Sequence, residues 1–256
     1  MTSTSNTVHL TSGGCAVDSS ASKILSVFET MSLISSVSNP ARMLAIYGGI
    51  TGLVYVETDG FRREAPFMFV LPVLALAVLT MALRMKPKTK YLTCSSFITI
   101  AIGLYLSALH RRELHYMCAI ISLSHILYLL SFLACIRRLW HGLAITMTVY
   151  LLAVVYYCFA DVFRSIPFMV SALSLHLAVI CASVVAAGSV WQYGSKRTDA
   201  QQAALFRFIG LLVCLGCSTM VIISQFGQRY YQINSALRIA HYVAQGLLFF
   251  ANERAF

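Results

Sequence analysis

Polar side chains with acid-base or hydrogen-bonding chemistry interrupt three of the long apolar stretches of this chain. One stretch contains His125 and Tyr128, which are three residues apart and therefore share one face of a helix. Another contains His176, and the last contains His241 and Gln245, four residues apart. An imidazole can accept or donate a proton, and a phenol or an amide can orient water or a substrate oxygen. These residue types could together form a site for acid-base chemistry.

Two interpretations of these residues are open. Each histidine taken alone is most simply a hydrogen-bonded structural residue. The three together, beside Tyr128, Tyr242 and Gln245, also fit a polar cavity shared by several helices. No Asp, Glu, Lys or Arg falls near the middle of an expected span, so the carboxylate relay that is usual in pumps and transporters is excluded.

Membrane helices must position these side chains. With 59% apolar and 11% charged residues, the chain has too little polar surface for a water-soluble globule. Its apolar stretches are continuous rather than alternating, which favours helices over a β-barrel. We therefore predict an all-α fold, an integral membrane bundle of about eight transmembrane helices. The expected spans are 43–57, 67–84, 91–109, 116–136, 140–160, 167–192, 203–225 and 236–251.

Three segments are expected. Residues 1–22 are rich in Ser, Thr and Gly, and they lack the basic and apolar regions of a signal peptide, so we predict a disordered cytosolic tail. Residues 23–40 have apolar side chains at helical spacing opposite a serine-rich face, which predicts a helix in the membrane interface or a cytosolic cap on the bundle. Residues 41–256 form the transmembrane domain.

The basic residues predict the orientation. Twelve of the 19 Lys and Arg residues, Arg207 among them, fall on the side of the N-terminus, and an even number of spans brings both termini to that side. The positive-inside tendency then places both termini in the cytosol. A seven-span alternative, without the first span, would move the N-terminal tail across the membrane.

The net charge of +10 predicts a partner of opposite sign. The basic residues lie at the ends of spans and form no groove with interleaved aromatics, so we expect anionic lipid headgroups rather than nucleic acid. Cys214 and Cys217 form a C-x-x-C pair inside a span, with no second pair and no nearby histidine in sequence, so we expect neither a metal site nor a disulfide. No cofactor motif is present, and the sequence leaves the oligomeric state open.

Several short motifs resemble the lysoplasmalogenase-like, YhhN-type family of multispan membrane proteins. The segment SHILYLLSF at 124–132 resembles the small-His-Leu-Leu-Tyr segment of that family, and HYVAQGL at 241–247 resembles its closing Tyr-Tyr-x-Ala-Gln-x-Leu. The segment LPVL at 71–74 is similar to its early Leu-Pro element, and 210–226 is similar to its seventh helix in length and pattern. The similarity covers roughly residues 43–251.

The resemblance implies an enzyme of the endoplasmic reticulum membrane that cleaves the vinyl ether bond of lysoplasmalogen, releasing a fatty aldehyde and a glycerophospho-base. The candidate catalytic residues of that family are two aspartates, whose places here look like Leu104, which follows Gly103, and Ser218. A lysine expected before the Leu-Pro element looks like Phe69. Ser218 could hold a water but cannot supply a carboxyl proton, and Leu104 can do neither.

Two functions therefore remain open. In a divergent hydrolase of lysophospholipids, the catalytic residues are His125, His176, His241 and Ser218, and the substrate-binding residues are Tyr128, Tyr242 and Gln245. In a catalytically inactive relative, the bundle would act in membrane lipid binding, in transport or as a protein-interaction scaffold. A receptor or an ion channel is disfavoured, because the spans carry no charged ring, re-entrant filter or voltage-sensing arginine series.

Overall fold

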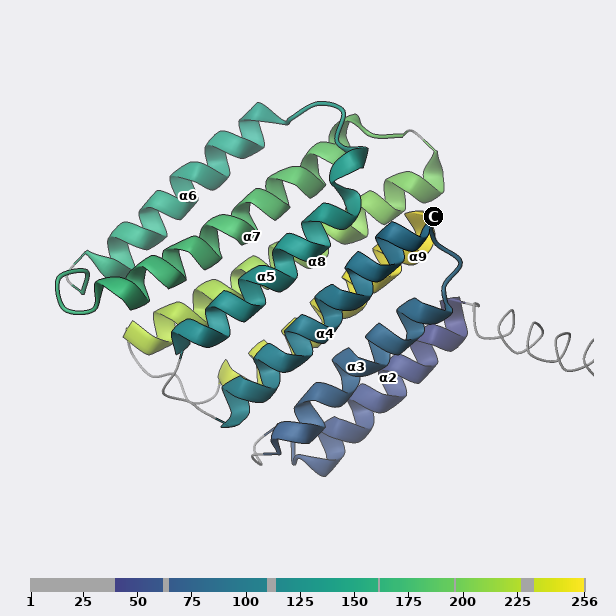
Figure 1. Cartoon of the computed structure of the whole chain (residues 1–256), viewed down its shortest axis with the longest axis horizontal. Coiled ribbons are helices and arrows are strands. Elements are labelled where there is room, and N and C mark those ends of the chain that lie inside the picture. The colour runs from purple at the N-terminus through teal and green to yellow at the C-terminus, as the bar shows by residue number, and fades with distance from the viewer. Residues whose placement is uncertain are drawn as a thin grey trace, which may run out of the picture. The chain divides into compact units, whose positions relative to one another are not determined.

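A computed structural model describes residues 40–61, 65–109, 114–160, 162–195, 197–226 and 233–255. These residues form eight α-helices and one short 3-10 helix, with no strand among them. The helices, labelled as in Figure 1, are α2 (Pro40–Glu57), α3 (Pro66–Ala82), α4 (Pro87–Leu109), α5 (Leu114–Phe132), η1 (Leu133–Cys135), α6 (His141–Phe159), α7 (Pro167–Tyr193), α8 (Thr198–Phe226) and α9 (Ile233–Ala255).

Proline marks the start of four of these helices, α2 at Pro40, α3 at Pro66, α4 at Pro87 and α7 at Pro167. Proline has no backbone N–H, which the first turn of a helix does not need, and its fixed φ suits helical geometry. No proline interrupts α8 or α9. The result is a set of long helices joined by short connections.

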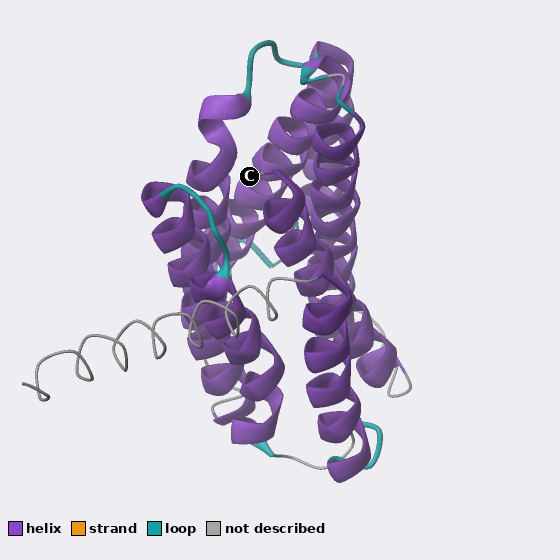
Figure 2. Cartoon of the chain, turned by 90° about the vertical axis from the view of Figure 1, so that its right-hand side faces the viewer, coloured by secondary structure: helices purple, strands orange, loops and turns teal. Residues whose placement is uncertain are grey.

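The helices pack in two layers within the described part of the chain. In one layer α2, α3, α4, α5, α7 and α6 lie side by side in that order, and α8 and α9 pack across one face of this row (Figure 1). Figure 2 shows the same helices from the side, with roughly parallel axes. Helix α8 contacts α6 and α7, and α9 contacts α8, α3 and α2. Side chains on facing surfaces of the two layers therefore meet inside the bundle.

Lipid rather than water suits the outer surface of this bundle. Five helical segments are long and apolar enough to cross a membrane: α4, α5 with η1, α6, α7 and α8. On α6 the side chains of Val149, Leu152 and Tyr156 are 61%, 63% and 78% exposed. Such a continuous apolar face is stable against hydrocarbon and unfavourable against water. The chain is therefore a multi-pass membrane protein with an all-helical bundle, as the sequence predicts.

The expected spans agree with the helices to within a few residues in most cases. The largest difference is at α8, which begins at Thr198 instead of 203. Differences of four residues occur at the start of α4 and at the ends of α5 and α9. Helices α2, α3 and α9 are not among the five spanning segments, and α3 is apolar but has 17 residues. The eight-span count stays a prediction. The predicted tail at 1–22 and interfacial helix at 23–40 lie outside the described residues.

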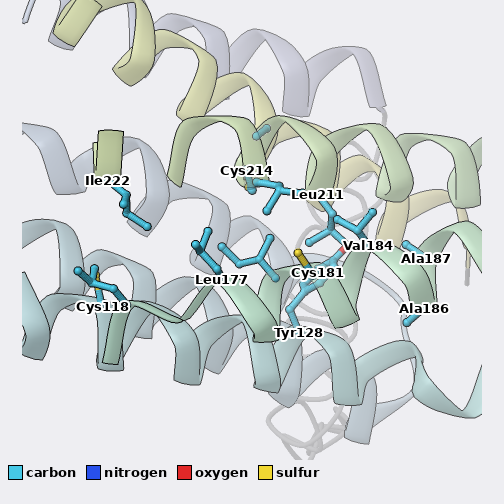
Figure 3. Packing of buried hydrophobic residues seen from close by; sticks show 14 of the residues in the cluster. Cys118, Tyr128, Leu177, Cys181, Val184, Ala186, Ala187, Leu211, Cys214 and Ile222 are labelled. Carbon is cyan, nitrogen blue, oxygen red and sulfur yellow. The ribbon is translucent and has the colours of Figure 1, made fainter. Parts of the chain in front are cut away.

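The apolar core is formed mainly by α5, α7 and α8, with further buried side chains from α6 and α9. Figure 3 shows Leu177 and Cys181 of α7 facing Leu211 and Cys214 of α8. All four side chains are buried. In a membrane, contacts of this kind stabilise the bundle through packing rather than through exclusion of water, because lipid tails are as apolar as the core. This packing fixes the register of α7 against α8, on which the site described below depends.

Helices α8 and α9 approach each other closely at Gly210. A Cβ on Gly210 of α8 would lie 2.9 Å from Leu248 Cδ2 and 3.2 Å from the carbonyl oxygen of Ala244 in α9. Gly48 and Gly52 of α2 have the four-residue spacing of a packing face, but both are exposed, with no atom within 4 Å of an added Cβ. Four-residue spacing of small residues marks a face but does not say whether a partner covers it.

Candidate functional site

Four helices bring together side chains that the sequence singles out. His125 comes from α5, His176 from α7, Ser218 from α8 and His241 from α9. The ring centroids of His125 and His176 are 6.2 Å apart, and His125 interacts electrostatically with both His176 and His241. His125 and His176 are only 2% and 4% exposed. His125, His176, Ser218 and His241 form, together with Ser122 of α5, what we call the histidine cluster.

A chain of three hydrogen-bonded side chains crosses the histidine cluster. The Oγ of Ser122 lies 3.0 Å from Nδ1 of His176, and Nε2 of His176 lies 3.2 Å from Oγ of Ser218. Ser122 also donates its hydroxyl proton to the carbonyl oxygen of Cys118 in its own helix. Both ring nitrogens of His176 therefore have a hydroxyl partner, which holds the imidazole in one orientation.

Two buried polar atoms on successive turns of α9 face the histidine cluster or its neighbour Cys214 without a hydrogen-bond partner of their own among the described residues. They are Nε2 of His241 and Oε1 of Gln245, one helical turn apart. The other end of the Gln245 amide donates to Sγ of Cys214 at 3.6 Å. A buried polar atom without a partner costs free energy, so both atoms favour any polar group that reaches them. This pair extends the histidine cluster along α9.

Tyr128 is one turn beyond His125 on α5, and its hydroxyl has a structural partner. The hydroxyl donates to the carbonyl oxygen of Leu248 in α9 at 2.9 Å, and it also interacts with Arg207. Its ring packs edge-on against Phe132. Tyr128 therefore joins α5 to α9 next to the histidine cluster, and its side chain is fully buried.

Tyr242 points away from the histidine cluster, toward α2 and α3. Its hydroxyl donates to the carbonyl oxygen of Phe69 at 2.8 Å, and its own carbonyl accepts a hydrogen bond from Tyr47 at 2.7 Å. Its ring also packs on Phe61. Although Tyr242 follows His241 directly in sequence, consecutive helical residues face different directions. The structure gives Tyr242 a role in joining α9 to α2 and α3.

Arg207 is a buried polar residue that sequence reasoning placed on the cytosolic flank. Its side chain is 2% exposed inside the bundle, where Nη2 donates to Oδ1 of Asn252 at 2.8 Å. The guanidinium lies 4.6 Å from the ring centre of Phe132, and Asn252 donates in turn to Thr93 of α4 at 3.0 Å. No described carboxylate forms an ion pair with it. The apolar residues on both sides of Arg207 were the signal that could have identified it.

The family resemblance implies aspartates at the positions of Leu104 and Ser218 and a lysine at that of Phe69. These three residues have different roles in this structure. Leu104 is half-buried on α4 beside Gly103. The guanidinium carbon of Arg238 in α9 lies 4.1 Å from the centre of the Phe69 ring, so a cation does reach the place where the family resemblance implies a lysine. Of the three positions, Ser218 is the one that belongs to the histidine cluster.

The described residues contain no group of three or more His, Cys, Asp or Glu side chains that could hold a metal ion. Their acidic residues, Glu57, Asp59, Asp199 and Glu253, lie near helix ends or in the turn after α2. The chemistry of the histidine cluster is therefore that of imidazole, hydroxyl and amide groups.

Fold and site together define a multi-pass helical membrane protein with a buried histidine cluster. The sequence matches no family model, no curated protein and no solved structure. Its similarity to the lysoplasmalogenase-like family therefore depends on the short motifs alone.

Proposed function

We propose that this chain is a membrane hydrolase that cleaves the vinyl ether bond of lysoplasmalogen, giving a fatty aldehyde and a glycerophospho-base. The observation that supports this function is the histidine cluster, in which His125, His176, Ser218 and His241 come from four helices. Ionisable groups are costly in hydrocarbon, so such a cluster is a functional site by default. The resemblance of two of its segments to the lysoplasmalogenase-like family gives the substrate class.

The reaction needs an acid and an activated water. A protonated imidazole donates its proton to the alkene carbon, which leaves an oxocarbenium ion, and water then attacks the carbon bonded to oxygen. The resulting hemiacetal breaks down to aldehyde and alcohol. His125 and His241 carry out the proton transfers, while Ser218, oriented by His176, holds the attacking water and Gln245 accepts a hydrogen bond from it.

Arg238 supplies a charge for the substrate phosphate. It precedes His241 by three residues on α9, and its guanidinium lies over the ring of Phe69, on the side of that helix that faces α3. The phosphate of a lysophospholipid is separated from the ether oxygen by only a glycerol backbone, so a cation one turn from the histidine cluster is well spaced to bind it. Among lysolipids, this arrangement favours phospholipids over neutral glycerol ethers.

The test is aldehyde release from alkenyl lysophospholipid by the purified full-length protein in detergent micelles. His125→Ala and His241→Ala should each lower the rate at least about 100-fold, the usual contribution of a general acid or base. The matched control is Ser183→Ala, which removes a buried hydroxyl that bonds only to its own helix. Wild-type activity in both histidine variants, with each eluting as a single species on gel filtration, would exclude this assignment.

A second function is supported by the absence of a carboxylate from the histidine cluster in the described part of the chain. Without that acid the chain could be a catalytically inactive relative that binds a membrane lipid, transports it or serves as an interaction scaffold. In that case a specific lysophospholipid should remain bound through purification and be identified by mass spectrometry. No aldehyde should form during a long incubation.

The cellular setting belongs to the same proposal. The family resemblance supports a place in the endoplasmic reticulum membrane, and the distribution of basic residues supports cytosolic termini. N-glycosylation acceptor sites fused to the two ends should both remain unmodified. Modification of one end alone would favour the seven-span alternative.

A further inference from the structure

The hydrogen bonds around His176 have a defined direction. Ser122 gives its only hydroxyl proton to the carbonyl oxygen of Cys118, so its Oγ can only accept from Nδ1–H of His176. A neutral imidazole with a proton on Nδ1 has an acceptor at Nε2. Ser218 must therefore be the donor in the contact at Nε2. The network assigns the tautomer of His176 and the direction of the Ser218 proton.

The hydroxyl of Ser218 donates to a different kind of acceptor from the neighbouring hydroxyls of α8. Thr219 donates to the carbonyl oxygen of Leu215 and Ser224 to that of Val221, which is the common arrangement for hydroxyls inside a helix. Ser218 instead donates to an imidazole on another helix. No described donor bonds to the oxygen of Ser218, and its proton is already hydrogen-bonded to the base His176.

His176 and Ser218 differ in how far their side chains are buried. His176 and Ser122 are 4% and 5% exposed, so the base and the group that orients it are shielded by the bundle. Ser218 is half-buried and can be reached from outside the protein. A reachable hydroxyl, a shielded base and a third group that orients the base are the parts of an activated serine nucleophile.

We propose that Ser218 is a nucleophile toward the carboxylic esters of membrane lipids, with His176 as its base and Ser122 as a positioning residue. Oγ of Ser218 bonds to the carbonyl carbon while its proton moves to Nε2 of His176. The bond from the carbonyl carbon to the alcohol oxygen then breaks, and the alcohol leaves with the proton from Nε2. Water, activated in the same way, releases a fatty acid and restores Ser218.

This ester chemistry uses Ser218 and His176, as the vinyl ether reaction proposed above does, but it attacks a different bond and yields a different product. Ester hydrolysis gives a fatty acid, and vinyl ether hydrolysis gives a fatty aldehyde. Esters of glycerolipids are the carboxylic electrophiles present in the surrounding membrane, and a half-buried residue on a spanning helix meets them before it meets a water-soluble ester.

The experiment uses the full-length protein in detergent micelles, a long-chain alkyl fluorophosphonate, and an ester-linked lysophospholipid as the lipid probe. Peptide mapping of the wild type should find the phosphonyl group on Ser218, and fatty acid should be released from the lysophospholipid. His176→Gln should slow labelling at least about 100-fold, the range expected for loss of a general base. Ser122→Ala should slow it less, because it removes orientation but leaves the base.

Ser224→Ala is the matched control, because Ser224 lies on the same helix with similar exposure but bonds only to its own backbone. It should label at the wild-type rate. The wild-type result does not depend on the folding of any variant. Absence of the phosphonyl group from Ser218, labelling undiminished in His176→Gln, or no fatty acid release would each overturn the proposal, whatever the outcome with the vinyl ether substrate.

Discussion

The hydroxyl of Ser218 lies 3.2 Å from Nε2 of His176, although 42 residues separate them in the chain. A short connection joins α7 to α8, so the two helices run in opposite directions and pack along most of their length. The contact therefore depends on the register of two long helices, and the core residues between them set that register. Ser122 of α5 completes the arrangement from a third helix.

The link between Ser122 and His176 should contribute to stability as well as to chemistry. Ser122→Ala leaves Nδ1 of His176 buried without its partner, which should lower the free energy of unfolding by about 1–3 kcal/mol. Titration of the protein with SDS in mixed micelles measures this change. Ser183→Ala, which removes a fully buried hydroxyl bonded only to Val179 of its own helix, should cost much less. Equal losses in the two variants would show that the contact with His176 adds nothing.

The fold could be predicted from sequence because hydrocarbon imposes one strong rule. Every backbone polar group must be satisfied inside the membrane, so long continuous apolar stretches become helices. This is why the expected span at 140–160 agrees so closely with α6 at His141–Phe159. Helix ends are harder to predict, since helices such as α8 continue past the apolar region into polar sequence.

The sequence indicated which side chains could belong to the candidate site, but not which of them meet. A polar residue inside an apolar stretch marks a place that needs a partner, and this identified His125, His176 and His241. Which partner it finds depends on helix packing, which no spacing within one helix reveals. Ser122 was missed for this reason, and Tyr242 was grouped with His241 although its hydroxyl bonds to Phe69 on the opposite side of α9.

Arg207 and Asn252 form a buried hydrogen-bonded pair, and substitutions at the two residues should have coupled effects on stability. Asn252→Leu removes the acceptor of Nη2 and leaves a buried cation short of a hydrogen bond, which should cost about 1.5–3 kcal/mol. Arg207→Met combined with Asn252→Leu should recover most of that loss, because the charge is removed together with its partner. The same SDS titration, analysed as a double-mutant cycle, measures the coupling. Strictly additive effects would mean that the two side chains do not support each other.

Tyr242 should be needed for stability rather than for turnover. Tyr242→Phe removes the donor to the carbonyl oxygen of Phe69 and should lower the free energy of unfolding by about 0.5–1.5 kcal/mol. Aldehyde release from alkenyl lysophospholipid, per folded molecule, should stay at the wild-type level, whereas His241→Ala should abolish it. A Tyr242→Phe variant of normal stability but low activity would instead support the substrate-binding role expected from the sequence.

Two glycines of α8 provide a test of the interface that holds the histidine cluster together. An added Cβ at Gly210 would lie 3.2 Å from the backbone carbonyl oxygen of Ala244, so Gly210→Ala must move α9 and should cost about 1–3 kcal/mol. Gly216 has no atom within 4 Å of an added Cβ, so Gly216→Ala should be neutral or slightly stabilising. Because α9 carries His241, the Gly210 variant should also lose activity in proportion to the displacement of that helix. Unfolding titrations and aldehyde assays on the two variants separate these effects, and equal stability of the pair would mean that α8 and α9 do not pack as closely as described.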